Sequence, residues 1–425
     1  MKSLLRSVAF LLLLASCKKD QDTTPVTTLP MITTTAVSAI SATAATSGGS
    51  ISSQGSAAIT ARGIVWSTNA NPTIDLLTKT NDGTGIGSFS STISGLTTGT
   101  VYHVRAYATN SAGTAYGNDI SFTSTSPKLY VCGTEWNTTT GNQQAKVWID
   151  GVGTYWTNST GGQESMGNKL FVTDAGDVYV SGAIKNTQWR AAYWKNGTAV
   201  YLTDGTYEAG AGGGIFVSGN DIYACGGERN AANVFSAKYW KNGTPVALTD
   251  GTKESVANTI FVSGNDVYVA GYEKNASGIN VAKYWKNGVA TTIGTGGAAN
   301  SILVSGTDLY IAGTYNASSD IGWIWKNSVS TDLPVSYGAN RVFVTGNDVY
   351  VAGFNNAYEA AYWKNGTKVN LSTGYNANSI FVSGADIYVA GKTSANTPCY
   401  WKNGVKTDLS ASTDWHNQAN DIIYK

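Results

Sequence analysis

Histidine is nearly absent from this chain of 425 residues, which has only His103 and His416. A histidine-based catalytic triad or a multi-histidine metal site is therefore not expected. No Gly-x-Ser-x-Gly elbow occurs, and Gly391-Lys392-Thr393 lacks the upstream glycine of a phosphate-binding loop. The sequence predicts no catalytic residue, no metal and no cofactor.

Cysteine and charge are also scarce. Of the four cysteines, Cys17 lies near the N-terminus, and Cys132 and Cys225 occupy positions where other copies of a repeat have small residues. We expect these to be buried thiols and expect no disulfide. Only 13% of residues are charged and the net charge is +1, which argues against nucleic acid as a partner.

A repeat of about 40 residues fills the chain after residue 125. In its clearest copy, the run Ile260 to Val262 is followed by a turn, the run Asp266 to Gly271, a variable loop, Ala282 to Trp285 and the turn Lys286-Asn287-Gly288. Asn-Gly is the strongest short hairpin signal, so each copy is predicted to form four short antiparallel strands. Such a unit, repeated around an axis, is typical of a propeller blade.

The number of copies follows from the expected starts of their second strands, which are Lys128, Asp177, Asp221, Asp266, Asp308, Asp348 and Asp386. The first copy lacks a first strand, and residues 419–424 align with the first-strand residues 377–382. We therefore expect the C-terminal strand to complete the first blade and to remove a free sheet edge. An eighth second strand at Asp421 is disfavoured, because an Ala-Asn pair precedes first strands. The prediction is an all-β chain in which residues 126–425 form a monomeric seven-bladed β-propeller.

The first residues predict a location. Lys2 and Arg6 precede an apolar stretch from Val8 to Leu14, which is too short to span a membrane. Leu-Ala-Ser-Cys, ending at Cys17, resembles a bacterial lipobox, and Lys18-Lys19-Asp20 resembles in part the export signal of surface lipoproteins in the Bacteroidota. The resemblance implies a signal peptide (1–16), a lipid on Cys17 that anchors the chain to the outer membrane, surface exposure, and a tether (17–30). The alternative is an ordinary secretory signal.

Residues 31–125 are expected to form a separate β-domain, rich in Thr, Ser, Ala and Gly. Leu96 and Tyr102, followed by the run Arg105 to Gly113, resemble a fibronectin type III domain. The resemblance implies a β-sandwich in which Tyr102 pins a loop to a strand, with Trp66 in the core, and a role as a spacer.

Features that recur in every copy are more typical of scaffold than of function. The repeated Asp at each second strand is expected to cap its own turn, and the lysines of the Lys-Asn-Gly turns to form a solvated rim. An asparagine is expected two residues before most first strands, where it caps the strand or, in the functional hypothesis, holds water or a polyhydroxylated group at the mouth of a central channel. This asparagine ring contains Asn168, Asn258, Asn300, Asn340, Asn378 and Asn420.

The repeat varies on one face only, where the loops between second and third strands meet the connections between blades. Aromatic and charged residues on such loops favour binding to sugar rings or to a protein partner. The candidate ligand-binding residues are Glu135, Trp136, Trp189, Arg190, Glu228, Arg229, Tyr272, Glu273, Tyr315, Phe354, Trp415 and His416. About half are expected to pack within their own loops.

Two functions remain open. The first is a cell-surface binding module for extracellular glycan or protein. The alternative is a propeller enzyme, hydrolase or lyase-like, acting on polysaccharide with Glu228 and Glu273 as acid and base.

Overall fold

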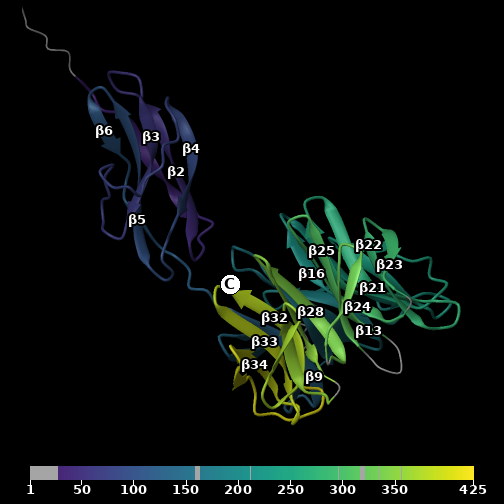
Figure 1. Cartoon of the computed structure of the whole chain (residues 1–425). Coiled ribbons are helices and arrows are strands. Elements are labelled where there is room, and N and C mark those ends of the chain that lie inside the picture. The colour runs from purple at the N-terminus through teal and green to yellow at the C-terminus, as the bar shows by residue number, and fades with distance from the viewer. Residues whose placement is uncertain are drawn as a thin grey trace, which may run out of the picture. The chain divides into compact units, whose positions relative to one another are not determined.

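The computed structural model describes residues 27–157, 163–210, 212–294, 296–315, 321–334, 336–355 and 357–425. These residues form strands and no helix, which confirms the predicted all-β class. They fall into two compact units, one ending at Thr125 and the other beginning at Ser126 (Figure 1). The signal peptide, the lipidation site Cys17 and the tether up to residue 26 lie outside the described residues.

None of the described segments is a helix that could cross a membrane.

The first unit contains two antiparallel sheets. One has the order β1 (Met31–Ser38), β2 (Ala44–Ser53) and β4 (Gly87–Ser94). In the other, β5 (Val101–Asn110) pairs with β3 (Ala61–Ser67), β6 (Gly113–Tyr116) and β7 (Ile120–Thr123).

Side chains from both sheets share one core in this unit. Ile93 of β4 and Ile64 of β3 are fully buried in it, and Trp66 is buried as predicted. Tyr102 Oη accepts a hydrogen bond of 3.0 Å from Thr97 N–H. The loop before β5 is therefore held to the strand by the tyrosine that the sequence indicated for this role.

The second unit contains seven sheets within its described residues, each built from strands in the order first, second, third and fourth. First strands are β36 (Gln418–Tyr424), β11 (Ser165–Val172), β15 with β16 (Ala209–Gly210 and Ile215–Ser218), β20 (Ser255–Ser263), β24 (Ala298–Ser305), β28 (Gly338–Thr345) and β32 (Gly374–Ser383). Second strands are β8 (Leu129–Asn137), β12 (Val178–Lys185), β17 (Asp221–Arg229), β21 (Asp266–Lys274), β25 (Asp308–Thr314), β29 (Asp348–Phe354) and β33 (Asp386–Thr393). Third strands are β9 (Asn142–Ile149), β13 (Trp189–Lys195), β18 (Phe235–Lys241), β22 (Asn280–Lys286), β26 (Gly322–Lys326), β30 (Ala360–Lys364) and β34 (Pro398–Lys402). Fourth strands are β10 (Val152–Tyr155), β14 (Thr198–Tyr201), β19 (Thr244–Ala247), β23 (Val289–Thr292), β27 (Val329–Asp332), β31 (Thr367–Asn370) and β35 (Val405–Asp408).

The C-terminal strand completes the first of these sheets, as predicted. β36 pairs antiparallel with β8, placing Ile422 opposite Val131. First strands contact one another in chain order from β11 to β32, then β32 contacts β36, and β36 contacts β11. The two ends of the unit are thus joined through one sheet, and β8 has a partner on each side.

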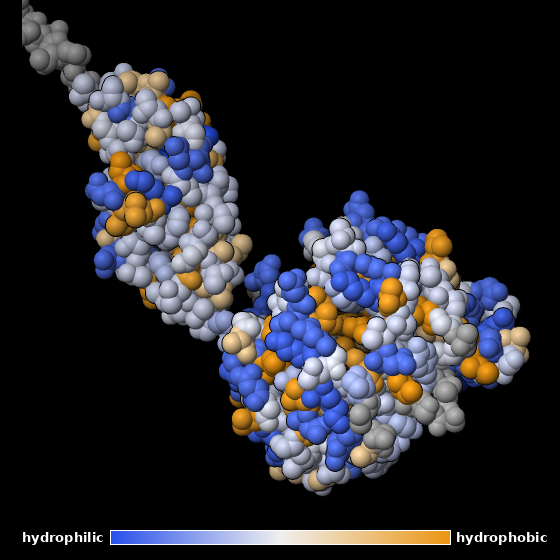
Figure 2. All heavy atoms as spheres, viewed as in Figure 1, coloured by the Kyte–Doolittle hydropathy of each residue, from blue (hydrophilic) through white to orange (hydrophobic). Residues whose placement is uncertain are grey.

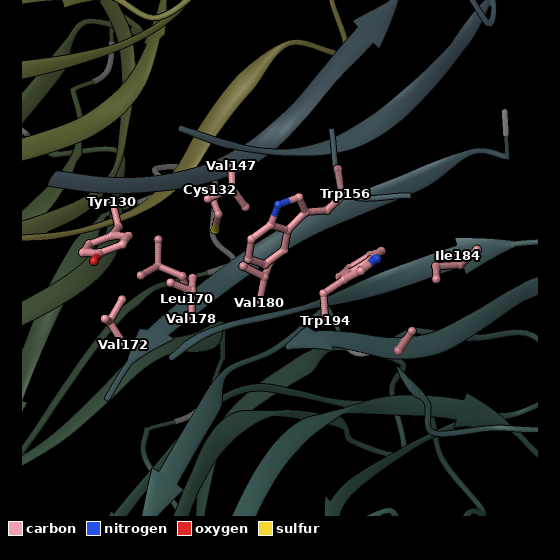
Figure 3. Close-up of a cluster of buried hydrophobic side chains, with 12 residues drawn as sticks. Tyr130, Cys132, Val147, Trp156, Leu170, Val172, Val178, Val180, Ile184 and Trp194 are labelled. Atoms are coloured by element: carbon pink, nitrogen blue, oxygen red, sulfur yellow. The ribbon is translucent and has the colours of Figure 1, made fainter. Parts of the chain in front are cut away.

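A tryptophan from each third strand packs against the preceding sheet. Trp194 of β13 lies in a cluster with Tyr130 and Cys132 of β8, and Figure 3 shows its indole among side chains of both sheets. Trp285 likewise packs on Tyr223 and Cys225 of β17. The equivalent residues Trp148, Trp240, Trp325, Trp363 and Trp401 each share a core cluster with the sheet before their own. All seven are at most 8% exposed.

The repeated aspartate was expected to cap its own turn, but it contacts the neighbouring hairpin instead. In the sheet of β21, Asp266 Oδ2 forms an ion pair of 2.7 Å with Lys286, and Asp266 Oδ1 accepts a hydrogen bond of 2.8 Å from Asn287 Nδ2. Lys286 also lies over the ring of Tyr268. Asn287 has φ of 51°, the left-handed conformation that the two-residue Asn-Gly turn requires. The carboxylate therefore holds the neighbouring hairpin, because that turn brings a cation and an amide to it.

We predict that acid destabilises the second unit through these aspartates. In each sheet the turn lysine, and to a smaller extent the turn asparagine, hydrogen-bonds to the aspartate and holds the pKa of its carboxyl group below the usual range. This applies to Asp221, Asp266, Asp308, Asp348 and Asp386. A lowered pKa in the folded state adds stability above the unfolded pKa of about 4, and this stability is lost as the pH falls through the folded pKa. The melting temperature, followed by circular dichroism, should decrease once the pH is lower than about 4. Asp266→Asn should weaken this dependence, and a melting temperature that stays constant down to that range in the parent protein would contradict it.

We predict that Trp363→Ala lowers the free energy of unfolding by about 3–5 kcal/mol, because it leaves a cavity between two sheets. Trp415, which is 70% exposed, provides the control. Trp415→Ala should change stability by only about 0.5 kcal/mol. Chemical denaturation measures both, and similar losses in the two variants would rule out the assigned role.

Candidate functional site

The predicted glutamates are bound within their own sheets. Glu228 forms an ion pair of 2.6 Å with Lys238, and Glu273 pairs with Lys283. Glu135 pairs with Lys146, accepts a hydrogen bond of 2.9 Å from Tyr155 Oη, and is only 2% exposed. Its expected position on an exposed loop is therefore wrong. The register of second and third strands places each glutamate diagonally across from a lysine on the same face of the sheet.

Both predicted arginines hold loops together. Arg190 donates from Nε to the carbonyl oxygen of Thr203 at 2.9 Å and lies 4.0 Å from the ring centroid of Tyr201. Arg229 Nε donates to Glu208 Oε2 at 3.0 Å. The positions of these guanidinium groups are thus explained by contacts within the unit.

Three predicted aromatic residues also pack locally. Trp189 is half-buried next to Lys185. Tyr315 packs on Trp323 at a centroid distance of 5.8 Å. Tyr272 is half-buried, and burial raises its pKa, with a smaller contribution from Glu254.

The remaining predicted aromatics come together with Tyr358 and Lys392, for which the sequence predicted no role in binding. Hydrophilic and apolar residues are interspersed on the visible face of the second unit (Figure 2). We call the residues that come together the aromatic row. It contains Phe354, Tyr358, Tyr375, Lys392, Trp415, His416 and Trp136.

One end of the aromatic row is built from the last connection and β8. Trp136 stacks on His416 with ring centroids 5.2 Å apart, and His416 contacts Trp415. Asn417 fixes this arrangement, because its Oδ1 accepts a 2.7 Å hydrogen bond from Trp136 N–H. His416 Nδ1 lies 2.5 Å from Asp414 Oδ1. Trp415 remains 70% exposed, so its indole is available to a ligand.

The other end lies beside an open cavity. Tyr358 stacks between Phe354 and Tyr375, with centroid distances of 5.8 and 5.6 Å. Tyr358 and Tyr375 line a cavity of about 590 Å³ together with Glu359, Asn370 and Ser394. Aromatic rings next to carboxylate, amide and hydroxyl groups can both stack on and hydrogen-bond to a sugar.

Lys392 connects the two ends. Its ammonium lies 5.6 Å from the ring centroid of Tyr375 and donates a hydrogen bond of 3.4 Å to the carbonyl oxygen of Trp415. Burial lowers the pKa of Lys392. Among the described residues, no carboxylate lies within 4.0 Å of this ammonium.

The backbone of Tyr358 is the least expected feature of the row. Asn355 Oδ1 accepts hydrogen bonds from Ala357 N–H and Glu359 N–H, and closes a tight loop in which Tyr358 has φ of 56°. Similar loops place Asn233, Gly278 and Asn396 at this left-handed position. Asn and Gly tolerate this conformation, whereas a bulky side chain there is an outlier and a hint of function. Alignment of these four loops would have revealed Tyr358 from sequence.

The position of the asparagines in their strands differs from the prediction. The six asparagines lie inside the first strands, at β-bulges, and not before them. Their side chains link neighbouring sheets: Asn258 Nδ2 donates to the carbonyl oxygen of Ala299 at 3.0 Å, and Asn300, Asn340, Asn378 and Asn420 make equivalent bonds. The six residues line one cavity of about 240 Å³ with Lys169 and Gly212.

The third sheet has glycine in place of the asparagine. A Cβ on Gly213 would lie 2.5 Å from Cys225 Sγ. The sulfur instead approaches the carbonyl oxygen of Ala257 at 3.7 Å. Cys132, Cys225 and Cys399 are buried free thiols, and burial raises the pKa of Cys225 to about 12.

Within the described part of the chain, no three His, Cys, Asp or Glu side chains are grouped so as to hold a metal ion.

Comparison with known proteins gives little. No protein-family model matches the chain, and no curated protein matches it. Among solved structures, it is similar to a DUF4784 family protein from Bacteroides caccae, with a TM-score of 0.29 and 10% sequence identity. That match covers 92% of this chain and 98% of the other. A TM-score this low supports no inference about fold or function.

We predict that Tyr358→Asn is more stable than Tyr358→Ala by about 1 kcal/mol. Both variants lose the ring, but alanine retains the cost of about 1–2 kcal/mol of the left-handed backbone, which asparagine tolerates. Denaturant titrations of the two proteins provide the comparison. If the alanine variant were as stable as the asparagine variant, the backbone of Tyr358 would carry no strain.

Proposed function

We propose that the chain is a cell-surface lipoprotein that binds extracellular glycan or protein through the variable loops of a seven-bladed β-propeller. The aromatic row is the contact surface in this proposal. A fibronectin type III-like domain separates it from the lipid anchor.

The propeller interpretation is supported by the order of the sheets. Within the described residues seven sheets follow one another, six of four strands and one in which β15 and β16 share the position of the first strand, and the C-terminal strand pairs with β8 in the first of them. Joining the ends through one sheet removes edges, which is how propellers limit edge-to-edge association. The two sheets of the first unit and the hydrogen bond of Tyr102 support the sandwich interpretation.

The observation that carries the binding proposal is the position of Tyr358. The residue is 45% exposed, has a backbone conformation that disfavours tyrosine, and completes a stack beside an open cavity. A scaffold role would be served better by the asparagine or glycine found in the equivalent loops. Strain of this kind is commonly retained where a side chain contacts a ligand.

The chemistry of the aromatic row favours a glycan over a purely apolar partner. The cavity beside Tyr358 combines rings with hydrogen-bonding groups, and Trp415 exposes most of its surface. Lys392 has no carboxylate within 4.0 Å in the part of the chain that the structure describes, and it would favour sugars carrying carboxylate or sulfate. An acidic polysaccharide is therefore the first ligand to test.

No observation favours the enzyme alternative. Glu228 and Glu273 each lie in an ion pair with a lysine of their own sheet, which accounts for both carboxylates.

The lipid anchor and the surface location rest on the lipobox at Cys17 and on the adjacent Lys18-Lys19-Asp20.

Affinity electrophoresis in gels containing neutral or acidic polysaccharides tests the proposal, using soluble protein that spans residues 27–425. We expect retention by at least one polysaccharide. Trp415→Ala and Tyr358→Asn should weaken it by about tenfold or more, since a central aromatic contact contributes about 2 kcal/mol. Tyr207→Ala is the matched control, because Tyr207 is also exposed but lies outside the aromatic row.

The same polysaccharides are also incubated with the protein in solution and assayed for new reducing ends. Cleavage that disappears in Glu228→Gln or Glu273→Gln would replace the binding module with a hydrolase. Retention that is equally weakened by Tyr207→Ala, or not at all by Trp415→Ala, would reject the aromatic row as the site. Absence of retention on every polysaccharide would reject a glycan ligand in favour of a protein partner.

A further inference from the structure

The cavity inside the asparagine ring is lined by one charged side chain, Lys169, whose position is not explained by contacts within the scaffold. Its wall is made of six amides that recur around the ring, together with the single cation Lys169. The amides that donate to a neighbouring carbonyl keep acceptor capacity at Oδ1, and only Asn420 Oδ1, among those described, also accepts a hydrogen bond of 3.5 Å, from Asn378 Nδ2. The cavity is therefore lined by acceptors for hydroxyl groups.

The residue after each ring asparagine shows where the repeat is broken. Four sheets have a small residue at this position: Gly214, Thr259, Ser301 and Ser379. The other three have Lys169, Arg341 and Asp421. Three ionisable side chains thus replace small residues at one level of the first strands.

Two of these charges are accounted for by each other. Asp421 is fully buried, and its Oδ2 lies 4.0 Å from Arg341 Nη1. Asp421 also accepts hydrogen bonds from Leu170 N–H at 3.0 Å and from Ser379 Oγ at 2.5 Å. The carboxylate is therefore saturated by backbone, hydroxyl and guanidinium groups.

Lys169 remains as the unbalanced charge. Among the described residues, no carboxylate lies within 4.0 Å of its ammonium. Burial lowers the pKa of Lys169, while Asp421 acts in the opposite direction. A partly buried cation that makes no ion-pair contact is costly to a fold and is explained by a ligand that supplies the negative charge.

The size of the cavity limits the ligand. A volume of about 240 Å³ exceeds the roughly 30 Å³ that one water occupies but is smaller than typical drug-sized pockets of about 300–1,000 Å³. The volume accommodates a single small molecule. The register places the ring next to the ends of the second strands that lead into the variable loops, since Ala257 lies opposite Gly271 and Val256 opposite Tyr272.

We propose that this cavity binds a small hydroxylated carboxylate of the hexuronate type, with its carboxylate on Lys169 and its hydroxyl groups on the asparagine ring. This site is separate from the aromatic row, and it does not depend on the proposed function. It adds a second, charge-selective position for an acidic sugar near the variable face.

Isothermal titration calorimetry with D-glucuronate and D-galacturonate tests the proposal, with D-glucose and D-galactose as neutral matches and protein spanning residues 27–425. Both uronates should bind at millimolar or lower concentrations, and the neutral sugars should bind about tenfold more weakly or worse, since a charged hydrogen bond is worth about 1.5–3 kcal/mol. Lys169→Thr should remove the preference for uronates. Thr259 occupies the equivalent position of β20, so this variant keeps a residue that the fold accepts.

Two further variants separate this site from the aromatic row. Lys169→Arg should keep uronate binding, and Trp415→Ala should leave it unchanged while reducing polysaccharide retention. Uronate binding that survives Lys169→Thr, equal binding of uronate and neutral sugar, or no heat with either uronate would each overturn the proposal. Loss of uronate binding in Trp415→Ala alone would move the acidic-sugar site to the aromatic row.

Discussion

The packing of one tryptophan from each sheet against the sheet before it is the interaction on which the second unit depends. Small sheets of four strands cannot bury both faces alone, and the indoles of Trp194, Trp285 and their equivalents fill the spaces between them. Because β36 joins β8, the last sheet also has a successor, and Trp148 packs on β33. Stability is therefore shared around the whole unit, which leaves the loops free to differ.

Polar contacts also recur from sheet to sheet, and most of their groups are bound within the scaffold. The Asp266–Lys286–Asn287 group fixes one turn of its sheet, Glu273 pairs with Lys283, and Asn258 links two first strands. The residues that break the repeat are not explained by the scaffold: these are the aromatic row with Lys392, and Lys169 in the cavity of the asparagine ring. In both departures hydrogen-bonding groups lie with a cation that has no carboxylate within 4.0 Å among the described residues.

The sequence predicted the scaffold better than the site because scaffold signals are local. Asn-Gly turns mark hairpins within a few residues, and the alignment of residues 419–424 with a first strand predicted the pairing of β36. Glu135 was misplaced because its diagonal contact with Lys146 depends on strand register, which a loop alignment does not reveal. Tyr358 was missed because its meaning depends on a left-handed backbone, and Lys169 because its lack of a partner appears only when seven first strands are brought together.

The central claim is that ligands are bound where the repeat is broken, at the variable end of the second unit. Hydroxyl-radical footprinting of the protein with a retained polysaccharide, read by mass spectrometry, tests this residue by residue. Oxidation of Trp415, Tyr358 and Tyr375 should decrease, while that of Tyr207 and of Val289, the first residue after a Lys-Asn-Gly turn, should not change. Protection of the Lys-Asn-Gly turns with no change at Trp415 would contradict the claim.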